Sequence, residues 1–225
     1  MKKDIKMQFK KYYILSCLLM LTIFASAQEE VIDEEDYNAS MQYANNGWDL
    51  IGREQFREAV SAFNQSINLY DGNADAFVGR ANALLRIEKF EEAQKDIEKA
   101  LALSPGQADM FYLAGNIYFK MEYYELASRN YSKAISSNDE SDVPVDLLNC
   151  YYNRGNAYFH AGMYRSAIND FTRVIEEKED NYNAYHNRAL AYKNREDYEN
   201  ACLDFQKAKE LGSNMSDRYI ERYCK

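Results

Sequence analysis

A basic and an acidic side chain stand out in one stretch of this chain. Arg154 and Asp170 lie among small and aromatic residues in NRGNAYFHAGMYRSAINDF, residues 153–171. A guanidinium and a carboxylate held together could transfer protons or bind a charged substrate, or they could form an ion pair that joins two helices. The rest of the sequence decides between these interpretations.

Few other residues have types that support catalysis. The chain has two histidines, His160 and His186, and four cysteines, without a C-x-x-C motif, a phosphate loop or a nucleophile motif. We therefore expect no catalytic residue, no metal site and no cofactor.

The first 27 residues have the three parts of a secretory signal peptide. Five lysines precede an uncharged run from Tyr12 to Ala27, which ends Ala-Ser-Ala. The alternative is a membrane anchor, but the run is shorter than the roughly 20 residues of a spanning helix. Lipid attachment at Cys17 is not expected, because most of the apolar run follows this cysteine. The sequence predicts cleavage after Ala27 and export to the periplasm or outside the cell.

The charge of the remaining chain limits its partners. Loss of residues 1–27 lowers the Lys+Arg count from 27 to 22 and the Asp+Glu count from 36 to 35, which leaves a net charge of −13. Nucleic acids and anionic membrane surfaces attract basic patches, so we expect neither as a partner. The charge is compatible with a basic partner and with a well-solvated surface.

The chain repeats itself with a period of 34 residues. The repeats are residues 40–73, 74–107, 108–141, 148–181 and 182–215, with residues 142–147 inserted before the fourth. If the 34 positions of a repeat are numbered as slots, slot 4 and slot 17 are aromatic, slot 8 is small and slot 24 is large. Slot 20 is alanine every time: Ala59, Ala93, Ala127, Ala167 and Ala201.

This spacing predicts two amphipathic helices in each repeat. Slots 4, 8 and 11 fall on one helical stripe, and slots 17, 20, 24 and 27 fall on another. Small residues at slots 8 and 20 let the two backbones approach closely, while the aromatic side chains fill the space around them. Because neither helix buries its stripe alone, the repeats must stack on one another.

The slot pattern resembles the tetratricopeptide repeat over residues 40–215. The segments YYNRGNAYFHAGMYRSAINDFTRVI and AYHNRALAYKNREDYENACLDFQKA carry the resemblance most clearly. It implies an all-α fold, a right-handed α-solenoid of five helix-turn-helix repeats with a C-terminal capping helix. Two positions depart from the family: Phe or Tyr replaces the Trp of slot 4, and the Pro of slot 32 remains only as Pro105.

The repeats also bear on the Arg–Asp question. Arg at slot 7 and Asp at slot 23 occur together in repeats two, four and five, and both are absent from repeats one and three. Three copies along a stack are a poor candidate for a catalytic centre, so we expect structural ion pairs within single repeats. These pairs are Arg80 with Asp96, Arg154 with Asp170, and Arg188 with Asp204.

A second stripe of the first helix is the candidate binding surface. In the family, slots 2, 5, 9 and 12, with slot 6 beside them, line a concave surface that holds peptides. Here the stripe is rich in asparagine, which pairs with peptide N–H and C=O groups, and in aromatic rings. The alternative is that asparagine at slot 9 is structural. The candidate groove residues are Asn82, Tyr112, Asn116, Phe119, Tyr152, Asn153, Asn156, Phe159, His186 and Asn187, with Asn183 and Lys193 on the same stripe.

One branch of the family binds the carboxylate at the end of a chaperone tail. It uses Lys at slot 5, Asn at slot 9 and further basic residues two repeats on. Asn116 and Asn153 match its polar members, but Tyr112, Asn183 and Asn187 occupy the basic positions. We therefore do not expect this clamp.

The segments around the repeats have their own patterns. Residues 28–39 are acidic and predict a flexible lead-in, and Pro144 in the insertion suits the start of a helix. Residues 216–225 predict a helix that caps the last repeat. A disulfide between Cys202 and Cys224 would fasten this cap if their Cα atoms lie within about 7 Å, and two free buried thiols are the alternative.

Together these features predict a non-enzymatic scaffold that binds a protein or peptide in the concave groove. The alternative is a structural subunit of a cell-envelope assembly that contacts its partners through the convex face or the ends of the stack. The sequence specifies neither the partner nor the oligomeric state.

Overall fold

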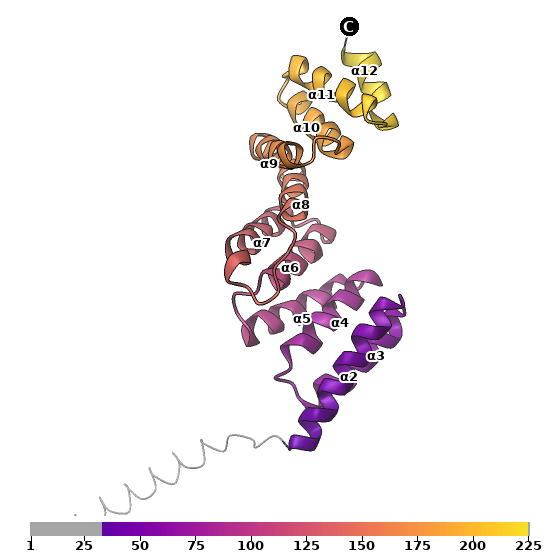
Figure 1. Cartoon of the computed structure of the whole chain (residues 1–225), viewed down its shortest axis with the longest axis vertical. Coiled ribbons are helices and arrows are strands. Elements are labelled where there is room, and N and C mark those ends of the chain that lie inside the picture. The colour runs from indigo at the N-terminus through magenta and orange to yellow at the C-terminus, as the bar shows by residue number, and fades with distance from the viewer. Residues whose placement is uncertain (1–32, 225) are drawn as a thin grey trace, which may run out of the picture. The chain divides into compact units, whose positions relative to one another are not determined.

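The computed structural model describes residues 33–224, which are helical apart from turns and loops (Figure 1). By its contacts the chain divides into two units, Met1–Asn38 and Ala39–Lys225, and the five repeats lie in the second. The predicted signal peptide, residues 1–27, lies outside the described residues. No helix of residues 33–224 combines the length and apolar character needed to cross a membrane.

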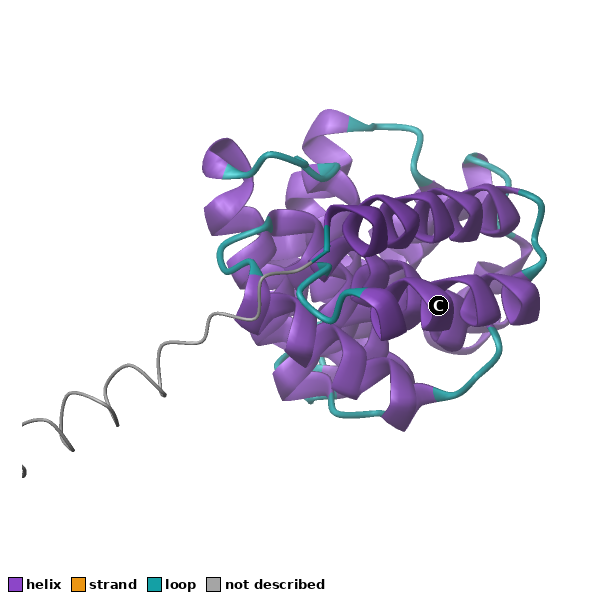
Figure 2. Cartoon of the chain, turned by 90° about the horizontal axis from the view of Figure 1, so that it is seen from below, coloured by secondary structure: helices purple, strands orange, loops and turns teal. Residues whose placement is uncertain are grey.

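Each repeat is a pair of helices, and loops connect successive helices (Figure 2). The first helices are α2 (Glu34–Gly52), α4 (Ala74–Arg86), α6 (Ala108–Lys120), α8 (Leu147–His160) and α10 (Tyr182–Asn194). The second helices are α3 (Phe56–Leu69), α5 (Phe90–Leu103), α7 (Tyr124–Ser137), α9 (Tyr164–Glu177) and α11 (Tyr198–Glu210). Second helices pack against the first helix of the next repeat, as α3 does on α4 and α7 on α8. This arrangement confirms the predicted α-solenoid of helix pairs.

The start of the repeats differs from the prediction. Residues 34–39 were expected to belong to a flexible lead-in, but they are the first residues of α2. Glu34, Glu35 and Asp36 form its first turn, where negative charge interacts favourably with the helix dipole. The prediction was wrong for these residues because an acidic composition suits a helix N-terminus as well as a disordered segment.

The insertion, residues 142–147, also differs from the prediction in one detail. Pro144 precedes helix α8 instead of starting it, and α8 begins at Leu147. The side chain of Asp146 accepts hydrogen bonds from the backbone N–H groups of Leu148 and Asn149 at 2.8 and 3.4 Å. Asp146 therefore provides the N-cap that starts the helix. Before the insertion, a short 3-10 helix, η1 (Asn138–Glu140), follows α7.

The core consists of large side chains that lie against small ones. The five slot-20 alanines have no exposed surface, and the slot-24 residues are at most 2% exposed: Phe63, Ile97, Tyr131, Phe171 and Phe205. The ring of Phe63 lies so close to Gly47 and Gly79 that a Cβ at either glycine would overlap it. Phe63 therefore depends on glycine both in its own repeat and in the next.

The turn within each repeat has one residue in the left-handed conformation, at slot 15. Gly162 has this conformation in repeat four, with φ 75°. In the other four repeats the residue is a glutamate with φ between 60° and 63°: Glu54, Glu88, Glu122 and Glu196. The N–H of the next residue bonds back to the carbonyl of slot 11, as Tyr123 does to Tyr118 at 2.9 Å, which closes the helix in a Schellman motif.

The C-terminal helix covers the last repeat. A short 3-10 helix, η2 (Asn214–Ser216), leads into α12 (Asp217–Tyr223), and both contact α11. Tyr219 stacks on the buried Phe205 with ring centroids 4.8 Å apart. Helix α12 thus occupies the place that a further repeat would take.

Candidate functional site

The Arg–Asp residues form bidentate pairs between the two helices of a repeat. Arg154 Nε and Nη2 each donate to an Asp170 carboxylate oxygen at 2.8 Å, and the side chains are 17% and 5% exposed. The other two pairs have the same geometry, with N–O distances of 2.7–2.8 Å: Arg80 with Asp96 and Arg188 with Asp204. Each carboxylate is therefore engaged by its own arginine, in three equivalent places.

Each of these arginines also reaches the preceding repeat. Its third nitrogen, Nη1, donates to a slot-25 side chain of the second helix before it. The three bonds are Arg80 to Asn64 at 2.6 Å, Arg154 to Ser132 at 3.0 Å and Arg188 to Thr172 at 3.0 Å. Sequence reasoning missed this contact, although a polar acceptor at slot 25 before each slot-7 arginine was a detectable signal.

The predicted groove residues form hydrogen bonds between neighbouring repeats. The Asn153 amide donates to the Tyr112 hydroxyl at 2.9 Å. The Asn187 amide donates to Tyr152 at 3.1 Å and to the Asn156 side-chain oxygen at 2.9 Å. These bonds tie slots 5 and 9 of one repeat to slot 6 of the next, so the asparagines also hold the stack together.

The tyrosines of this stripe are neutral donor–acceptor groups. Burial raises the pKa of the Tyr112 hydroxyl, and hydrogen bonds with Asn116 and Asn153 act in the opposite direction. Burial likewise raises the pKa of Tyr152 against hydrogen bonds with Asn156 and Asn187. Both hydroxyls stay protonated at neutral pH because the ordinary tyrosine pKa is already near 10.

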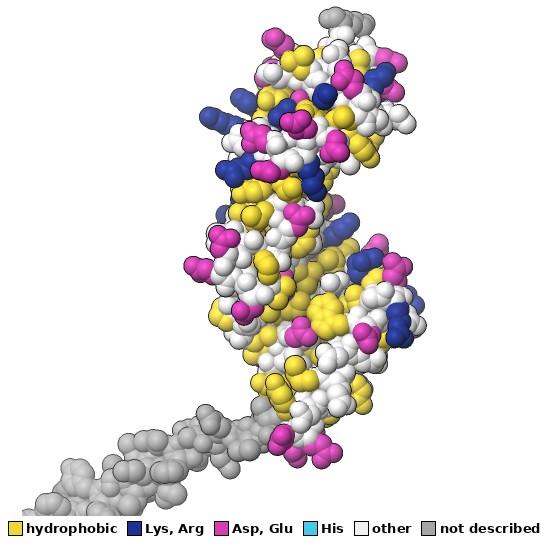
Figure 3. All heavy atoms as spheres, in the orientation of Figure 1, with side chains coloured by type: hydrophobic (Ala, Val, Ile, Leu, Met, Phe, Trp, Pro, Cys, Tyr) yellow, Lys and Arg dark blue, Asp and Glu magenta, His cyan; other side chains and the backbone are white. Residues whose placement is uncertain are grey.

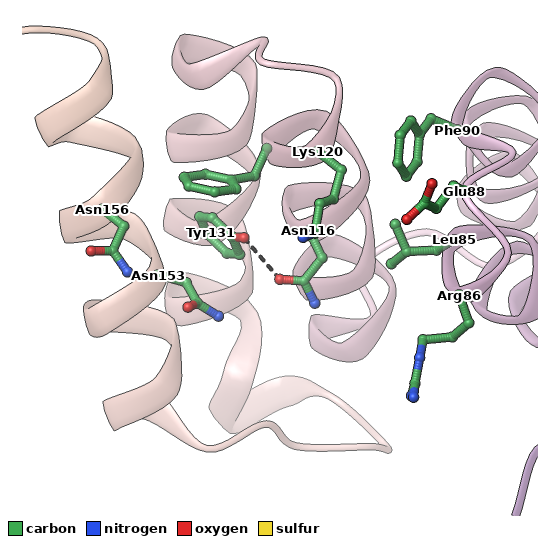
Figure 4. A pocket seen from close by; sticks show the side chains of 10 residues that line it. Leu85, Arg86, Glu88, Phe90, Asn116, Lys120, Tyr131, Asn153 and Asn156 are labelled. Atoms are coloured by element: carbon green, nitrogen blue, oxygen red, sulfur yellow. Dashed lines mark hydrogen bonds between the residues drawn. The ribbon is translucent and has the colours of Figure 1, made fainter. Parts of the chain in front are cut away.

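A pocket of about 440 Å³ opens between three successive repeats (Figure 4). We call it the three-repeat pocket. Its lining residues are Leu85, Arg86, Glu88, Phe90, Asn116, Phe119, Lys120, Tyr131, Asn153 and Asn156. The hollow between α4 and α6 is visible on the face drawn in Figure 3, where hydrophobic side chains line it and both basic and acidic side chains lie at its margin.

The three-repeat pocket contains four of the ten predicted groove residues, Asn116, Phe119, Asn153 and Asn156. Leu85 was missed although it lies at slot 12, on the predicted stripe. The other lining residues were missed because they lie at the ends of helices and in turns, at slots 13, 15 and 17, or in the core, as Tyr131 does. The Tyr131 hydroxyl donates to the Asn116 oxygen at 2.8 Å, which fixes the orientation of that amide.

Other predicted residues lie elsewhere. Tyr152 and Asn183 line a smaller pocket of about 180 Å³ with Lys178. The Phe159 ring packs on Tyr164 and His160, with ring centroids 5.6 Å apart in both pairs. Asn82, Tyr112, Asn187 and Lys193 are partly exposed and do not line the three-repeat pocket.

His186 is not a groove residue, contrary to the prediction. It is 5% exposed, its Nδ1 lies 2.9 Å from the Ser216 hydroxyl, and its ring packs against Phe205 and Tyr219. Burial, and then the charge of Arg218, lower its pKa from 6.5. The prediction was wrong because repeat five is the last, and the segment that follows it covers this position.

The cysteines have two different environments. Cys202 on α11 and Cys224 after α12 form a disulfide with a Cα–Cα distance of 5.4 Å. Cys150 is a free, fully buried thiol, and burial raises its pKa to about 11, with a contribution from the charge of Asp146. A thiol with this pKa is protonated and therefore a poor nucleophile at neutral pH. Residues 33–224 contain no group of three or more His, Cys, Asp or Glu side chains that could hold a metal ion.

The comparisons with known proteins agree with this architecture. Models of the tetratricopeptide repeat match residues 45–108, 78–142, 149–181 and 182–212. A comparison with curated proteins gives no match.

Solved structures share the fold at low sequence identity. The crystal structure of YrrB, a tetratricopeptide-repeat protein with an unusual peptide-binding site, has a TM-score of 0.73 at 24% identity and covers 88% of this chain and 97% of that one. A MamA protein has a TM-score of 0.68 at 20% identity, over 82% and 95%. MamA from Desulfovibrio magneticus RS-1 has a TM-score of 0.69 at 16% identity, over 80% and 97%. The period, the slots, the helix pairs and these matches lead to one conclusion: the chain belongs to the tetratricopeptide repeat family.

Proposed function

We propose that the protein is a non-enzymatic scaffold that binds an extended peptide segment of a partner protein in the three-repeat pocket. The pocket is the observation that carries this proposal, because it places apolar rings beside amide groups on the stripe of first helices. Its volume, about 440 Å³, falls within the roughly 300–1,000 Å³ of ligand sites. YrrB, which is similar in fold, is described as having a peptide-binding site.

We also propose that the protein acts after export, with residues 1–27 removed. The basic start, the uncharged run and the Ala-Ser-Ala ending support this proposal. The disulfide between Cys202 and Cys224 fits the same setting, since disulfides persist in oxidising compartments. N-terminal sequencing of the protein recovered from the cell envelope tests it, and an intact Met1 on recovered protein contradicts it.

A peptide selection tests the binding role. Residues 28–225 are used to select binders from a random peptide library, and the affinity of a selected peptide is measured by calorimetry. We expect the double variant Asn153→Ala, Asn156→Ala to lose at least about tenfold in affinity, because each lost hydrogen bond costs roughly 1 kcal/mol. Asn169→Ala is the matched control, since Asn169 is exposed on α9. Equal affinity for the double variant and the control contradicts the proposal.

A second candidate is a structural role through the end of the stack. Tyr43, at slot 4 of repeat one, is 42% exposed, whereas the same slot of repeat two holds Phe77 at 7% exposure. A partner could cover this ring. In that case Tyr43→Ser, rather than the asparagine variants, would abolish capture of the partner.

A further inference from the structure

The amides of the three-repeat pocket have fixed orientations. The Asn116 oxygen accepts from Tyr131 at 2.8 Å, and the Asn156 oxygen accepts from Asn187 at 2.9 Å. An amide oxygen held in this way leaves the NH₂ group to face other partners, and each NH₂ has two hydrogens. Asn116 and Asn156 interact with a tyrosine of the same helix, Tyr112 and Tyr152 respectively. Because each NH₂ has two hydrogens, these amides can also donate into the pocket.

The charged groups of the pocket add to these donors. Arg86 and Lys120 occupy slot 13 of successive repeats, and within residues 33–224 neither forms an ion pair. Glu88 is the one carboxylate among the described residues of the lining. The lining thus has an excess of one positive charge in a chain whose net charge is −9. In Figure 4, Lys120 and Asn116 lie together on α6, and Asn156 lies on α8 with its amide nitrogen turned toward them.

Three residues of the lining are apolar. Leu85 and Phe90 face the pocket from the α4–α5 side, and Phe119 faces it from α6. A ligand that satisfies the whole lining must therefore offer hydrogen-bond acceptors with negative charge next to an aliphatic or aromatic group. In an extended chain successive side chains point to opposite faces, so a peptide in which the two kinds of residue alternate directs its carboxylates to one side of the pocket and its apolar groups to the other.

We propose that the three-repeat pocket recognises an extended peptide in which Asp or Glu side chains alternate with large apolar side chains. This inference rests on the proposed peptide-binding function and adds the chemistry of the partner. The carboxylate binds between the Lys120 ammonium and the Asn116 and Asn156 amides, with Arg86 on the opposite side. The apolar side chain packs on Phe119 and Phe90. The cations come from slot 13, near the ends of the first helices, and not from the slots of the carboxylate clamp that the sequence lacks.

Three synthetic peptides test this recognition. The first is Ac-GLEVELEVG-NH₂, the second has Gln in place of every Glu, and the third has Lys. Affinities for residues 28–225 are measured by fluorescence anisotropy at low and moderate salt. We expect the Glu peptide to bind at least about tenfold more tightly than the Gln peptide, because hydrogen bonds to a charged acceptor are stronger than hydrogen bonds to a neutral one. The Lys peptide should bind most weakly.

Variants of the protein test which side chains bind the carboxylates of the peptide. Lys120→Glu and Arg86→Glu should each lower the affinity for the Glu peptide about tenfold, and Glu88→Gln should raise this affinity. Lys99→Glu is the matched control, because Lys99 is exposed on α5 and outside the pocket, and it should change the affinity less than about twofold. All four side chains are exposed, and circular dichroism and thermal unfolding establish that each variant folds. Arg86→Glu also removes the contact of the guanidinium with the Phe56 ring, 4.6 Å away, so Lys120→Glu is the decisive variant.

The outcomes separate this inference from the binding role. Equal affinity for the Glu and Gln peptides, or no effect of Lys120→Glu, overturns the inference. If the peptides selected from the library are then neutral or basic and their binding still requires Asn153 and Asn156, the peptide-binding function stands without the preference for acidic side chains. If no selected peptide depends on these residues, both fall. If only peptides with a free C-terminal carboxylate bind more tightly, the pocket recognises the end of a peptide chain. That result would overturn the proposed recognition of Asp or Glu side chains.

Discussion

At Arg154, one side chain joins two repeats. Its Nε and Nη2 bind the Asp170 carboxylate of the same repeat, and its Nη1 binds the Ser132 hydroxyl of the preceding one. The planar guanidinium suits this arrangement because its donors diverge in fixed directions. A residue that could be mistaken for part of an active site therefore fixes the packing within a repeat and between repeats.

Loss of the Asp170 carboxylate should be costly. Asp170→Ala leaves a largely buried guanidinium without its anion, and we expect the free energy of unfolding to fall by about 3 kcal/mol. A double-mutant cycle with Arg154→Ala, followed by urea denaturation, should give a coupling of at least about 1 kcal/mol. The exposed pair of Lys89 and Glu92 is the control and should give less than about 0.5 kcal/mol. Equal coupling for the two pairs contradicts a structural role for the buried one.

His186 should make stability depend on pH. Burial and the charge of Arg218 lower its pKa below 6.5 in the folded protein, so the unfolded chain binds a proton more readily. The contribution of His186 to the free energy of unfolding is fully present above about pH 6.5, the pKa in the unfolded chain. It decreases as the pH falls toward the folded pKa, by at most about 1.4 kcal/mol per pH unit. His186→Gln should remove this slope, and His160→Gln, at an exposed position, should retain it. Parallel stability curves for His186→Gln and the unchanged protein would exclude this contribution.

At the scale of the helices, packing depends on rings that lie against glycine. Phe63 of α3 has no exposed surface and touches Gly47 of α2 and Gly79 of α4. The sequence predicted the first contact, since slot 8 is small in every repeat. It did not predict the second, because slot 6 is glycine only in repeat two and no recurring pattern marks it.

Gly79→Ala should disturb two repeats at once. A Cβ at this position overlaps the Phe63 ring, and relieving the overlap in a packed core costs about 1–3 kcal/mol. Gly52→Ala is the control, because a Cβ there meets nothing within 4 Å. Thermal unfolding should show a lower Tm for Gly79→Ala and an unchanged or higher Tm for Gly52→Ala. If both variants match the unchanged protein, Phe63 can move without cost.

At the scale of the molecule, the slot pattern was sufficient to predict the helix pairs. In repeats two, three and five the first helix spans slots 1–13, and in repeats one to four the second spans slots 17–30. The three-repeat pocket could not be predicted in the same way. Arg86, Lys120 and Asn153 lie in three different repeats, and only the geometry of stacking brings them to one opening.

The disulfide should stabilise one end of the stack. Cys202 and Cys224 are separated by 22 residues, and a closed loop of that size is worth about 3 kcal/mol in the chain-entropy account. Because stacked repeats interact mainly with their neighbours, reduction should act locally. Hydrogen exchange should become faster in α11 and α12, by up to about a hundredfold, while α4 and α5 keep their protection. An equal increase in α4 would show that the array unfolds as one unit.

The four left-handed glutamates imply a reserve of stability. Side chains with a Cβ adopt this conformation at a cost of about 1 kcal/mol or more, which glycine avoids. Glu122→Gly should therefore be more stable than Glu122→Ala by about 1 kcal/mol, whereas the order should reverse at Arg129, which is exposed inside α7. Denaturation of these four variants separates conformation from charge, because the Gly and Ala variants at each position lack the same charged group. Glycine at all four turns would yield a more heat-resistant scaffold from substitutions outside the core.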